Sequence, residues 1–235
     1  MLELRDLVKH YRIGRGEPVR AVDGVSLTVG AGEFVALYGP SGSGKTTLIE
    51  VIAALKAPDQ GSVLVDGRDI ASCSEKERDE YRLYQLGLIC GPQSLIPGAR
   101  AIENAVLKLL LVKARDAQAI VEPLLEELGL AGRLRNRTEQ LSMGERQRVL
   151  IARALSTHPK IVLADEPTGS LDSARTQEVL GLLRRVCREN GTALLLATHD
   201  PQAAAFADEV HELRDGRLGP YTPEHPTTSA SALPE

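Results

Sequence analysis

The stretch Gly39-Pro40-Ser41-Gly42-Ser43-Gly44-Lys45-Thr46 decides how the rest of this sequence is interpreted. It fits the pattern G-x-x-x-x-G-K-[ST] without a mismatch, and its glycines let successive backbone N–H groups point inward around phosphate oxygens. An apolar run at 33–38 predicts a strand before it, and 46–55 follows with a helical period. Because loops of this pattern join a strand to a helix, we expect a nucleotide site here. A glycine-rich turn with a chance lysine is the plainer alternative.

Four side chains in and beyond this loop have the chemistry for phosphate transfer. Lys45 would place a mobile positive charge on the β- and γ-phosphates, and the Thr46 hydroxyl would bind Mg²⁺. A second apolar run, 161–164, ends in Asp165 and Glu166. Asp165 would hold Mg²⁺ directly or through water, and Glu166 would orient or deprotonate an attacking water. Taken alone, such a pair after a strand is more often a turn, so this interpretation depends on the phosphate loop.

The hydrophobic patterning predicts an α/β fold with an inserted helical part. Residues 2–29 alternate apolar and polar side chains, which is typical of antiparallel strands. The continuous apolar runs at 161–164 and 193–197 favour parallel strands that are covered on both faces. Between them, about 72–140 is rich in charged and amphipathic helical segments, and we expect it to form a helical subdomain inserted in the core. The main domain would then span 1–218.

The composition excludes several classes of protein. The 235 residues carry a formal net charge of −4, without the basic excess that a nucleic-acid binder uses to neutralise phosphates. The cysteines Cys73, Cys90 and Cys187 form no CxxC pair, which argues against a disulfide framework or a zinc site. No run approaches the roughly 20 apolar residues of a membrane-spanning helix. The tail 219–235 is rich in proline, serine and threonine, and we expect disorder there.

Further motifs, in order along the chain, resemble those of the ABC-transporter ATPases. The resemblance runs from about residue 2 to 218 and rests on their order and spacing, because each motif alone has a plainer interpretation as a strand aromatic, a structural histidine or a helix cap. The motifs are Tyr11 where the family places an aromatic against adenine, 86–104 around the Q-loop, Leu-Ser-Met-Gly-Glu-Arg-Gln-Arg at 141–148 for the LSGGQ signature, Pro-Thr-Gly-Ser-Leu-Asp at 167–172 for the D-loop, and His199 for the switch histidine.

The resemblance implies a P-loop ATPase core of mixed sheet with antiparallel N-terminal strands, and a head-to-tail dimer with two ATP molecules at its interface. Glu166, His199 and Lys45 would be catalytic. The residues implied to contact ATP in one protomer are Tyr11, Gly39, Pro40, Ser41, Gly42, Ser43, Gly44, Lys45, Thr46 and Thr47. The residues implied to reach the same ATP from the opposite protomer are Ser142, Gly144, Glu145 and Asp172. Magnesium would be held by Thr46 and Asp165, with Gln93 as a further candidate ligand.

The sequence departs from the family pattern at three positions. Gly91 stands where the Q-loop glutamine is expected, and Gln93 lies two residues further on, after Pro92. Glycine offers no amide to place Mg²⁺ and water, so we expect either that Gln93 substitutes or that this contact is lost. Met143 replaces the first signature glycine and would be strained wherever the backbone requires a positive φ. Arg146 replaces a glutamine, which we expect to be a mild change.

The motifs Pro-Thr-Gly-Ser-Leu-Asp and Ile-Glu-Asn at 102–104 resemble most closely the lipoprotein-releasing, macrolide-exporting and FtsE-type branch. We therefore expect an ATPase that drives a separate membrane permease by export or mechanotransmission, and that lies at the cytoplasmic face of the membrane through that partner. It would neither insert into the membrane nor bind nucleic acid. Two alternatives stay open, namely a soluble ABC ATPase of an assembly complex and an ATP-gated regulatory module with little turnover.

Overall fold

A computed structural model describes residues 1–12, 17–169 and 171–221 of the chain. Its main element is a six-stranded sheet in the order β10-β9-β3-β8-β7-β6, in which the five strands from β9 to β6 are parallel. Its strands are β3 Phe34–Tyr38, β6 Leu86–Ile89, β7 Ile161–Asp165, β8 Ala193–Thr198, β9 Glu209–Arg214 and β10 Arg217–Pro220. Strands β7 and β8 contain the apolar runs 161–164 and 193–197, and the prediction of parallel strands there is confirmed. The strand expected at 33–38 is β3.

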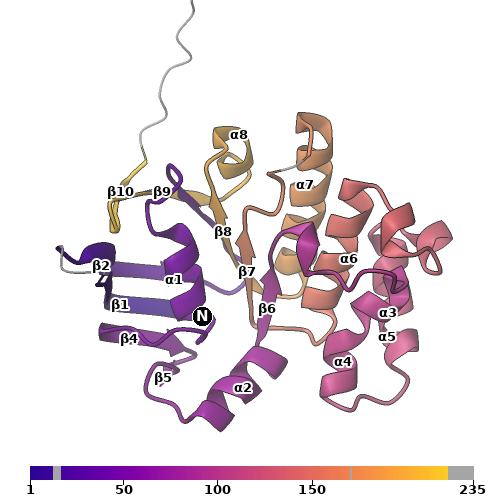
Figure 1. Cartoon of the computed structure of the whole chain (residues 1–235), viewed down its shortest axis with the longest axis horizontal. Helices are drawn as coiled ribbons and strands as arrows, with labels where there is room; N and C mark the ends of the chain where they lie inside the picture. The colour runs from indigo at the N-terminus through magenta and orange to yellow at the C-terminus, as the bar shows by residue number, and fades with distance from the viewer. Residues whose placement is uncertain (13–16, 170, 222–235) are drawn as a thin grey trace, which may run out of the picture.

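A second sheet is antiparallel and holds the N-terminus, as the alternating pattern predicts (Figure 1). It has the order β2-β1-β4-β5 and consists of β1 Leu2–Tyr11, β2 Val19–Val29, β4 Gln60–Val65 and β5 Arg68–Asp69. Helix α1, Lys45–Ile52, lies between the two sheets, because its apolar side chains share one buried cluster with both. This cluster fixes the helix that follows the phosphate loop.

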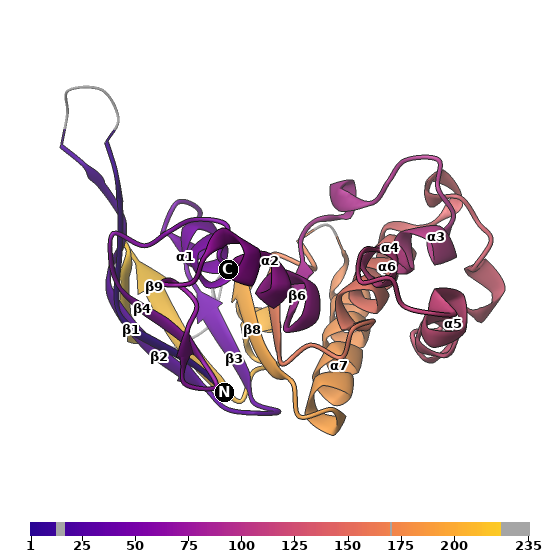
Figure 2. The ribbon, with the colours of Figure 1, turned by 90° about the horizontal axis from the view of Figure 1, so that it is seen from below.

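The opposite face of the six-stranded sheet is covered by helices. They form a second buried cluster with alternate residues of β3, β7 and β8. Figures 1 and 2 show α3, α4 and α5 at the end of the molecule away from the antiparallel sheet. The helices on this side are α3 Ala101–Ala105, α4 Leu107–Leu111, α5 Ala117–Glu127, α6 Met143–Leu155, α7 Ser173–Glu189 and α8 Pro201–Ala204. None of the helices in the described ranges is both long and apolar enough to span a bilayer.

The start of the expected helical insertion belongs to the core instead. Helix α2, Glu75–Tyr84, is tied to the end of α1, because the Tyr81 hydroxyl donates to the Ile52 carbonyl at 3.1 Å. Strand β6 then pairs with β7 inside the six-stranded sheet. The part of 72–140 that leaves the sheet therefore begins only after β6. Strand β6 is only four residues long, and in the sequence it stands between a charged segment and a loop that contains glycine.

The end of the domain also differs from the expected boundary at 218. Gly219 and Pro220 pair with Glu212 and His211, so β10 continues two residues into the expected tail. The ring of Tyr221 then packs edge-on against Tyr38, with 5.1 Å between the ring centroids. Pro220 is tolerated because β10 is an edge strand. The expectation of disorder for the rest of the tail falls on 222–235, outside the described residues.

Lys108 connects the helical part to the core and should give stability a distinct pH dependence. Its Nζ donates to the Leu86 carbonyl of β6 at 2.5 Å, and burial lowers its pKa from 10.5 to about 8. Between these two values the unfolded chain binds more protons than the folded protein, so this lysine makes the free energy of unfolding rise with pH. The rise between pH 8 and pH 10 is about 2 kcal/mol at 1.36 kcal/mol per pKa unit.

We predict that Lys108→Met removes this rise, because the variant has no group that titrates at this position. Denaturant unfolding of wild type and variant at pH 8, 9 and 10 measures the difference between them. Lys76→Met, which alters an exposed lysine of α2, is the matched control and should keep the wild-type pH dependence. Parallel curves for wild type and Lys108→Met would contradict the buried lysine.

Candidate nucleotide-binding and catalytic site

The phosphate loop fits between the sheets only because it carries glycine at two close approaches. Gly44 has φ +109°, and a Cβ added there would lie 1.9 Å from the backbone oxygen of Ala21 on β2. A Cβ on Gly39 would lie 2.2 Å from the carbonyl oxygen of Leu213 on β9. Gly44 also caps α1 without any side-chain hydrogen bond, so the N–H groups of the first helical turn stay available to an anion.

Lys45 turns its charge into this loop. Its side chain is only 6% exposed, and Nζ donates to the carbonyls of Gly39 at 2.7 Å and Pro40 at 3.0 Å. The same Nζ lies 3.8 Å from Oε1 of Glu166. The ammonium is therefore placed between the loop backbone and the carboxylate at the end of β7. From this position it can contact a phosphate that binds in the loop.

A cavity of about 600 Å³ lies over the loop and has the size of a small-ligand site. The predicted site residues that line it are Tyr11, Ser41, Gly42, Gly44, Lys45, Thr46, Thr47 and Glu166. The ammonium groups of Lys56 and Lys9 lie 5.2 Å and 5.8 Å from the centroid of the Tyr11 ring. Cation–π attraction at these distances holds the ring at the edge of the cavity. The structure thus brings the aromatic residue from β1 together with the loop, 28 residues or more further along the chain.

The residues around Asp165 fit a magnesium ion. Its Oδ1 is buried without a hydrogen-bond partner, and its carboxylate is hydrogen-bonded to Thr46. Burial raises the pKa of Asp165, Glu166 and Glu50 raise it further, and Thr46 and Lys45 oppose them. An unpaired carboxylate oxygen beside a hydroxyl is the oxygen pair that Mg²⁺ prefers. In the described ranges no three His, Cys, Asp or Glu side chains gather as a metal site, so the remaining ligands would be phosphate and water oxygens.

Glu166 is aimed across the ends of the strands by an uncommon backbone conformation. Its φ is +46°, in the left-handed region that non-glycine residues rarely adopt. Its N–H donates to the Ala197 carbonyl of β8, its Oε1 lies 2.9 Å from His199 Nδ1, and its Oε2 accepts from the Thr198 hydroxyl at 3.4 Å. The carboxylate is thus oriented by two neighbours after β7, and it can accept a proton from a water in the cavity. Sequence reasoning missed Thr198 as an orienting residue, although it stands directly before His199.

The signature and D-loop residues do not line this cavity. Ser142 caps α6, because its hydroxyl accepts from Glu145 N at 3.2 Å while Glu145 Oε2 accepts from Ser142 N at 2.8 Å. Asp172 caps α7 with its side chain alone, which accepts from Arg175 N at 2.9 Å. A Cβ on Gly144 would lie 3.8 Å from Arg175 Cδ, so the starts of the two helices are neighbours. Within one chain, the residues of the phosphate loop therefore lie apart from the signature and D-loop residues. We call these two groups the half-sites.

The substitutions in the signature are accommodated without strain. Met143 is the first residue of α6 and does not have a positive φ, so the left-handed conformation that would strain methionine does not occur. Its side chain is 37% exposed. Arg146 Nε donates to the carbonyls of Thr138 at 2.8 Å and Leu141 at 3.1 Å. The arginine thus holds the turn that leads into the signature helix.

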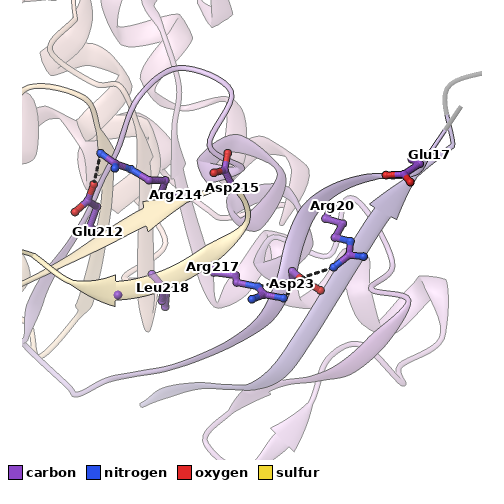
Figure 3. A pocket seen from close by; sticks show the side chains of 9 residues that line it. Glu17, Arg20, Asp23, Glu212, Arg214, Asp215, Arg217 and Leu218 are labelled. Atoms are coloured by element: carbon purple, nitrogen blue, oxygen red, sulfur yellow. Dashed lines mark hydrogen bonds and ion pairs between the residues drawn. The ribbon is translucent and has the colours of Figure 1, made fainter.

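A second cavity of about 650 Å³ lies beside the first, between β2 and the β9–β10 hairpin (Figure 3). Its three arginines are paired with carboxylates. Arg217 donates to Asp23 Oδ2 at 2.8 Å, Arg20 lies 3.6 Å from the same oxygen, and Arg214 Nη2 lies 3.1 Å from Glu212 Oε1. The Arg217–Asp23 pair connects β10 with β2, and thus the two sheets, next to the phosphate loop, whereas the other two pairs lie within β2 and within β9. We therefore regard this cavity as part of the scaffold.

Comparison with known proteins agrees with this geometry. The profile of the family described as ABC transporter matches residues 22–169. The lipoprotein-releasing system ATP-binding protein LolD 2 of Caulobacter vibrioides is 43% identical over 220 residues, which cover 93% of this chain and 96% of the relative. The macrolide export ATP-binding/permease protein MacB of Rhodopirellula baltica is 41% identical over 220 residues, which cover 92% of this chain and 32% of MacB.

Solved structures also match this chain. The dimeric structure of MJ0796, a bacterial ABC transporter cassette, has a TM-score of 0.84 and 34% identity, and the match covers 93% of this chain and 96% of that chain. The same cassette in a dimeric post-hydrolysis state bound to ADP and Pi also gives a TM-score of 0.84. The match thus includes a structure with hydrolysis products bound.

We predict that Lys45→Ala weakens ATP binding about 10- to 100-fold, because charge-assisted hydrogen bonds contribute about 1.5–3 kcal/mol each. Titration with a fluorescent ATP analogue measures the dissociation constant. Lys160→Ala, which removes the ion pair with Asp66 on the surface, is the matched control and should bind like wild type. Near-normal affinity in a folded Lys45→Ala variant would refute the assignment of the phosphate loop.

Proposed function

This chain belongs to the ABC transporter family, and from that premise we propose that it is the subunit whose ATP hydrolysis drives a separate membrane permease of the release or export type. As an ABC ATPase it binds ATP and hydrolyses it to ADP and phosphate. The permease, the type of transport and the place of the chain at the cytoplasmic face of the membrane are part of the proposal. The names of the relatives, which concern lipoprotein release and macrolide export, support the branch.

The observation that carries the proposed mechanism is the separation of the two half-sites. Lys45 and Glu166 face the cavity, whereas Ser142 and Asp172 begin α6 and α7 away from it. We propose that a second copy, arranged head to tail, brings its Ser142, Gly144, Glu145 and Asp172 to the ATP in this cavity. The dimeric state of the MJ0796 cassette supports this arrangement. ATP would then join the two protomers, and hydrolysis would remove the contacts to the γ-phosphate.

Within each half-site the chain's own groups have separate tasks in the proposed reaction. Tyr11 stacks against the adenine, while the loop N–H groups and Lys45 bind the phosphates. Magnesium held by Thr46 and Asp165 would neutralise phosphate charge when bound. Glu166 orients the attacking water and accepts its proton, and His199 keeps the carboxylate in place at 2.9 Å. Lys45 leaves the neighbourhood of Glu166 when it turns to the phosphates, which frees the carboxylate to act as a base.

The exposed apolar side chains of the helical part support a contact with the permease. Leu110 and Leu111 at the end of α4 are 57% and 69% exposed. Leu110 lines a groove between α4 and α5 together with Val106, Leu107 and Ala117, and Leu111 is the next residue along α4. Large exposed apolar side chains gathered in this way mark interaction sites more often than free surface. We propose that a cytoplasmic segment of the permease binds here and receives the motion of the helical part.

We predict that Glu166→Gln traps an ATP-bound dimer. The variant keeps the phosphate loop that binds nucleotide, but its amide cannot accept the proton from water. Light scattering coupled to size-exclusion chromatography with Mg²⁺ and ATP should show twice the mass of the nucleotide-free protein. The double variant Glu166→Gln, Lys45→Ala is the control and should stay monomeric, because it lacks the phosphate contact. An unchanged mass for Glu166→Gln with ATP would exclude the sandwich dimer.

The proposed association with a permease is tested by purifying the tagged chain from its native membranes in mild detergent. The proteins that co-purify with it are then identified by mass spectrometry. We expect a permease with few transmembrane helices and a large external domain, and Leu111→Asp should reduce its recovery at least fivefold. Ile120→Asp is the matched control, since this 41% exposed side chain lies in the same subdomain but lines a different cavity with Val186. Recovery of the wild type without any membrane partner would favour the soluble ABC ATPase instead.

A further inference from the structure

Helix α6 carries a buried amide that makes no hydrogen bond. Gln147 is only 1% exposed, and within the part of the chain that the structure describes neither its Oε1 nor its Nε2 has a hydrogen-bond partner. Such an amide has given up its hydrogen bonds to water without replacing them, and this lowers the stability of the folded chain. Because the large majority of buried polar groups in native proteins are paired, the unpaired amide of Gln147 calls for a physical reason.

Gln147 lies on the side of α6 that faces β6. A Cβ added to Gly87 of β6 would lie 2.8 Å from the carbonyl oxygen of Ala154, so the end of α6 packs directly against this strand. Gln147 precedes Ala154 by seven residues, which is close to two helical turns. Both residues therefore lie on the same side of the helix.

Two turns along the helix bring this amide to the carboxyl end of β6. The chain passes from the end of α6 into β7, which is parallel to β6, so α6 runs in the opposite direction to both strands. Two helical turns cover about 11 Å. The same distance along β6 leads from Gly87 about three residues further, to Cys90. The amide of Gln147 is therefore level with the first residue of the loop after β6.

This level of the sheet belongs to the nucleotide site. Ile89 pairs with Ala164 in the parallel register, and the residues that follow them are Cys90 and Asp165. Asp165 holds the unpaired buried oxygen that fits a magnesium ion. Gln93 follows in the same loop but is exposed and outside the lining of the cavity over the phosphate loop, so its role as a ligand stays a prediction.

Helix α6 joins this loop to the signature residues. Near the end of the helix, Arg153 donates to the Ser94 carbonyl at 3.0 Å and to the Ser94 hydroxyl at 3.1 Å. At its start are Ser142 and Gly144, which contact the partner's ATP in the proposed dimer. Gln147 lies one turn after Gly144, between these two contacts. A displacement at the start of α6 therefore moves the unpaired amide relative to the loop after β6.

We propose that Gln147 is a positioning residue that is unpaired in the single chain and gains its hydrogen bonds when the ATP-bound dimer forms. Contact with the partner's ATP shifts the start of α6, and the amide then bonds the backbone at the start of the loop after β6. These new hydrogen bonds favour the dimer over the single chain and fix the loop beside Asp165. This inference rests on the head-to-tail dimer of the proposed function and is independent of the permease.

The melting temperature of the nucleotide-free chain gives the first test. Gln147→Leu has a similar volume and removes the unpaired amide, so its Tm should rise by about 2–6 °C. Gln147→Met, with a more flexible apolar side chain, is a second variant in case leucine packs poorly. Gln118→Leu, which alters an exposed glutamine of α5, is the matched control and should leave the Tm unchanged.

The second test measures the ATP concentration at which half of the Glu166→Gln chains are dimeric, by light scattering with Mg²⁺. Adding Gln147→Leu should raise this concentration about tenfold or more, because each α6 of the dimer loses its new hydrogen bonds. Adding Gln118→Leu should not change it. Binding of a fluorescent ATP analogue to the single chain, at protein concentrations too low for dimer formation, should stay the same, since the phosphate loop is intact.

The two tests must move in opposite directions. If the Tm of neither Gln147 variant rises, the proposal is overturned, because a buried water or another contact then satisfies the amide in the single chain. An unchanged ATP requirement for dimer formation overturns it as well. If Glu166→Gln alone forms no dimer with ATP, the dimer of the proposed function is refuted and this inference falls with it.

Discussion

The close approach of the phosphate loop to two neighbouring strands is the constraint on which the rest of the structure depends. Gly44 passes the carbonyl of Ala21, and Gly39 passes that of Leu213, at distances that leave no room for a side chain. Because β2 and β9 belong to different sheets, the loop can form only when both sheets are assembled. The burial of α1 between the sheets fixes the same region from the other side. Folding and nucleotide binding therefore depend on the same contacts.

The carboxylate of Glu166, the proposed base, is positioned by three kinds of interaction at once. The positive φ of Glu166 turns its side chain away from the direction of β7, the backbone of β8 fixes its N–H, and Thr198 and His199 orient its oxygens. Such a conformation costs of order 1–3 kcal/mol and persists only where the surroundings determine it. The surrounding contacts fix one orientation of the proposed base before any substrate binds, which is how a preorganised site lowers a reaction barrier.

Local spacing allowed much of the site to be predicted, whereas tertiary contacts decided the rest. The loop, Asp165 and Glu166 are recognisable because consecutive residues define them, and β3, β7 and β8 because their apolar runs are continuous. The core membership of β6 escaped prediction, since a four-residue strand has no periodicity of its own and depends on β7 for its hydrogen bonds.

Helix α6 has a different partner at each end. At its start, Ser142 and Glu145 cap the turn that carries the signature residues, and two residues from its end Arg153 donates to the backbone carbonyl of Ser94 in the loop after β6. Thirteen helical residues span roughly 20 Å and transmit displacement as a stiff rod. In the proposed dimer, one end would sense the partner's nucleotide while the other adjusts the chain's own site. Occupancy of the two sites would then be thermodynamically linked, and by reciprocity each ATP would change the affinity for the other by the same factor.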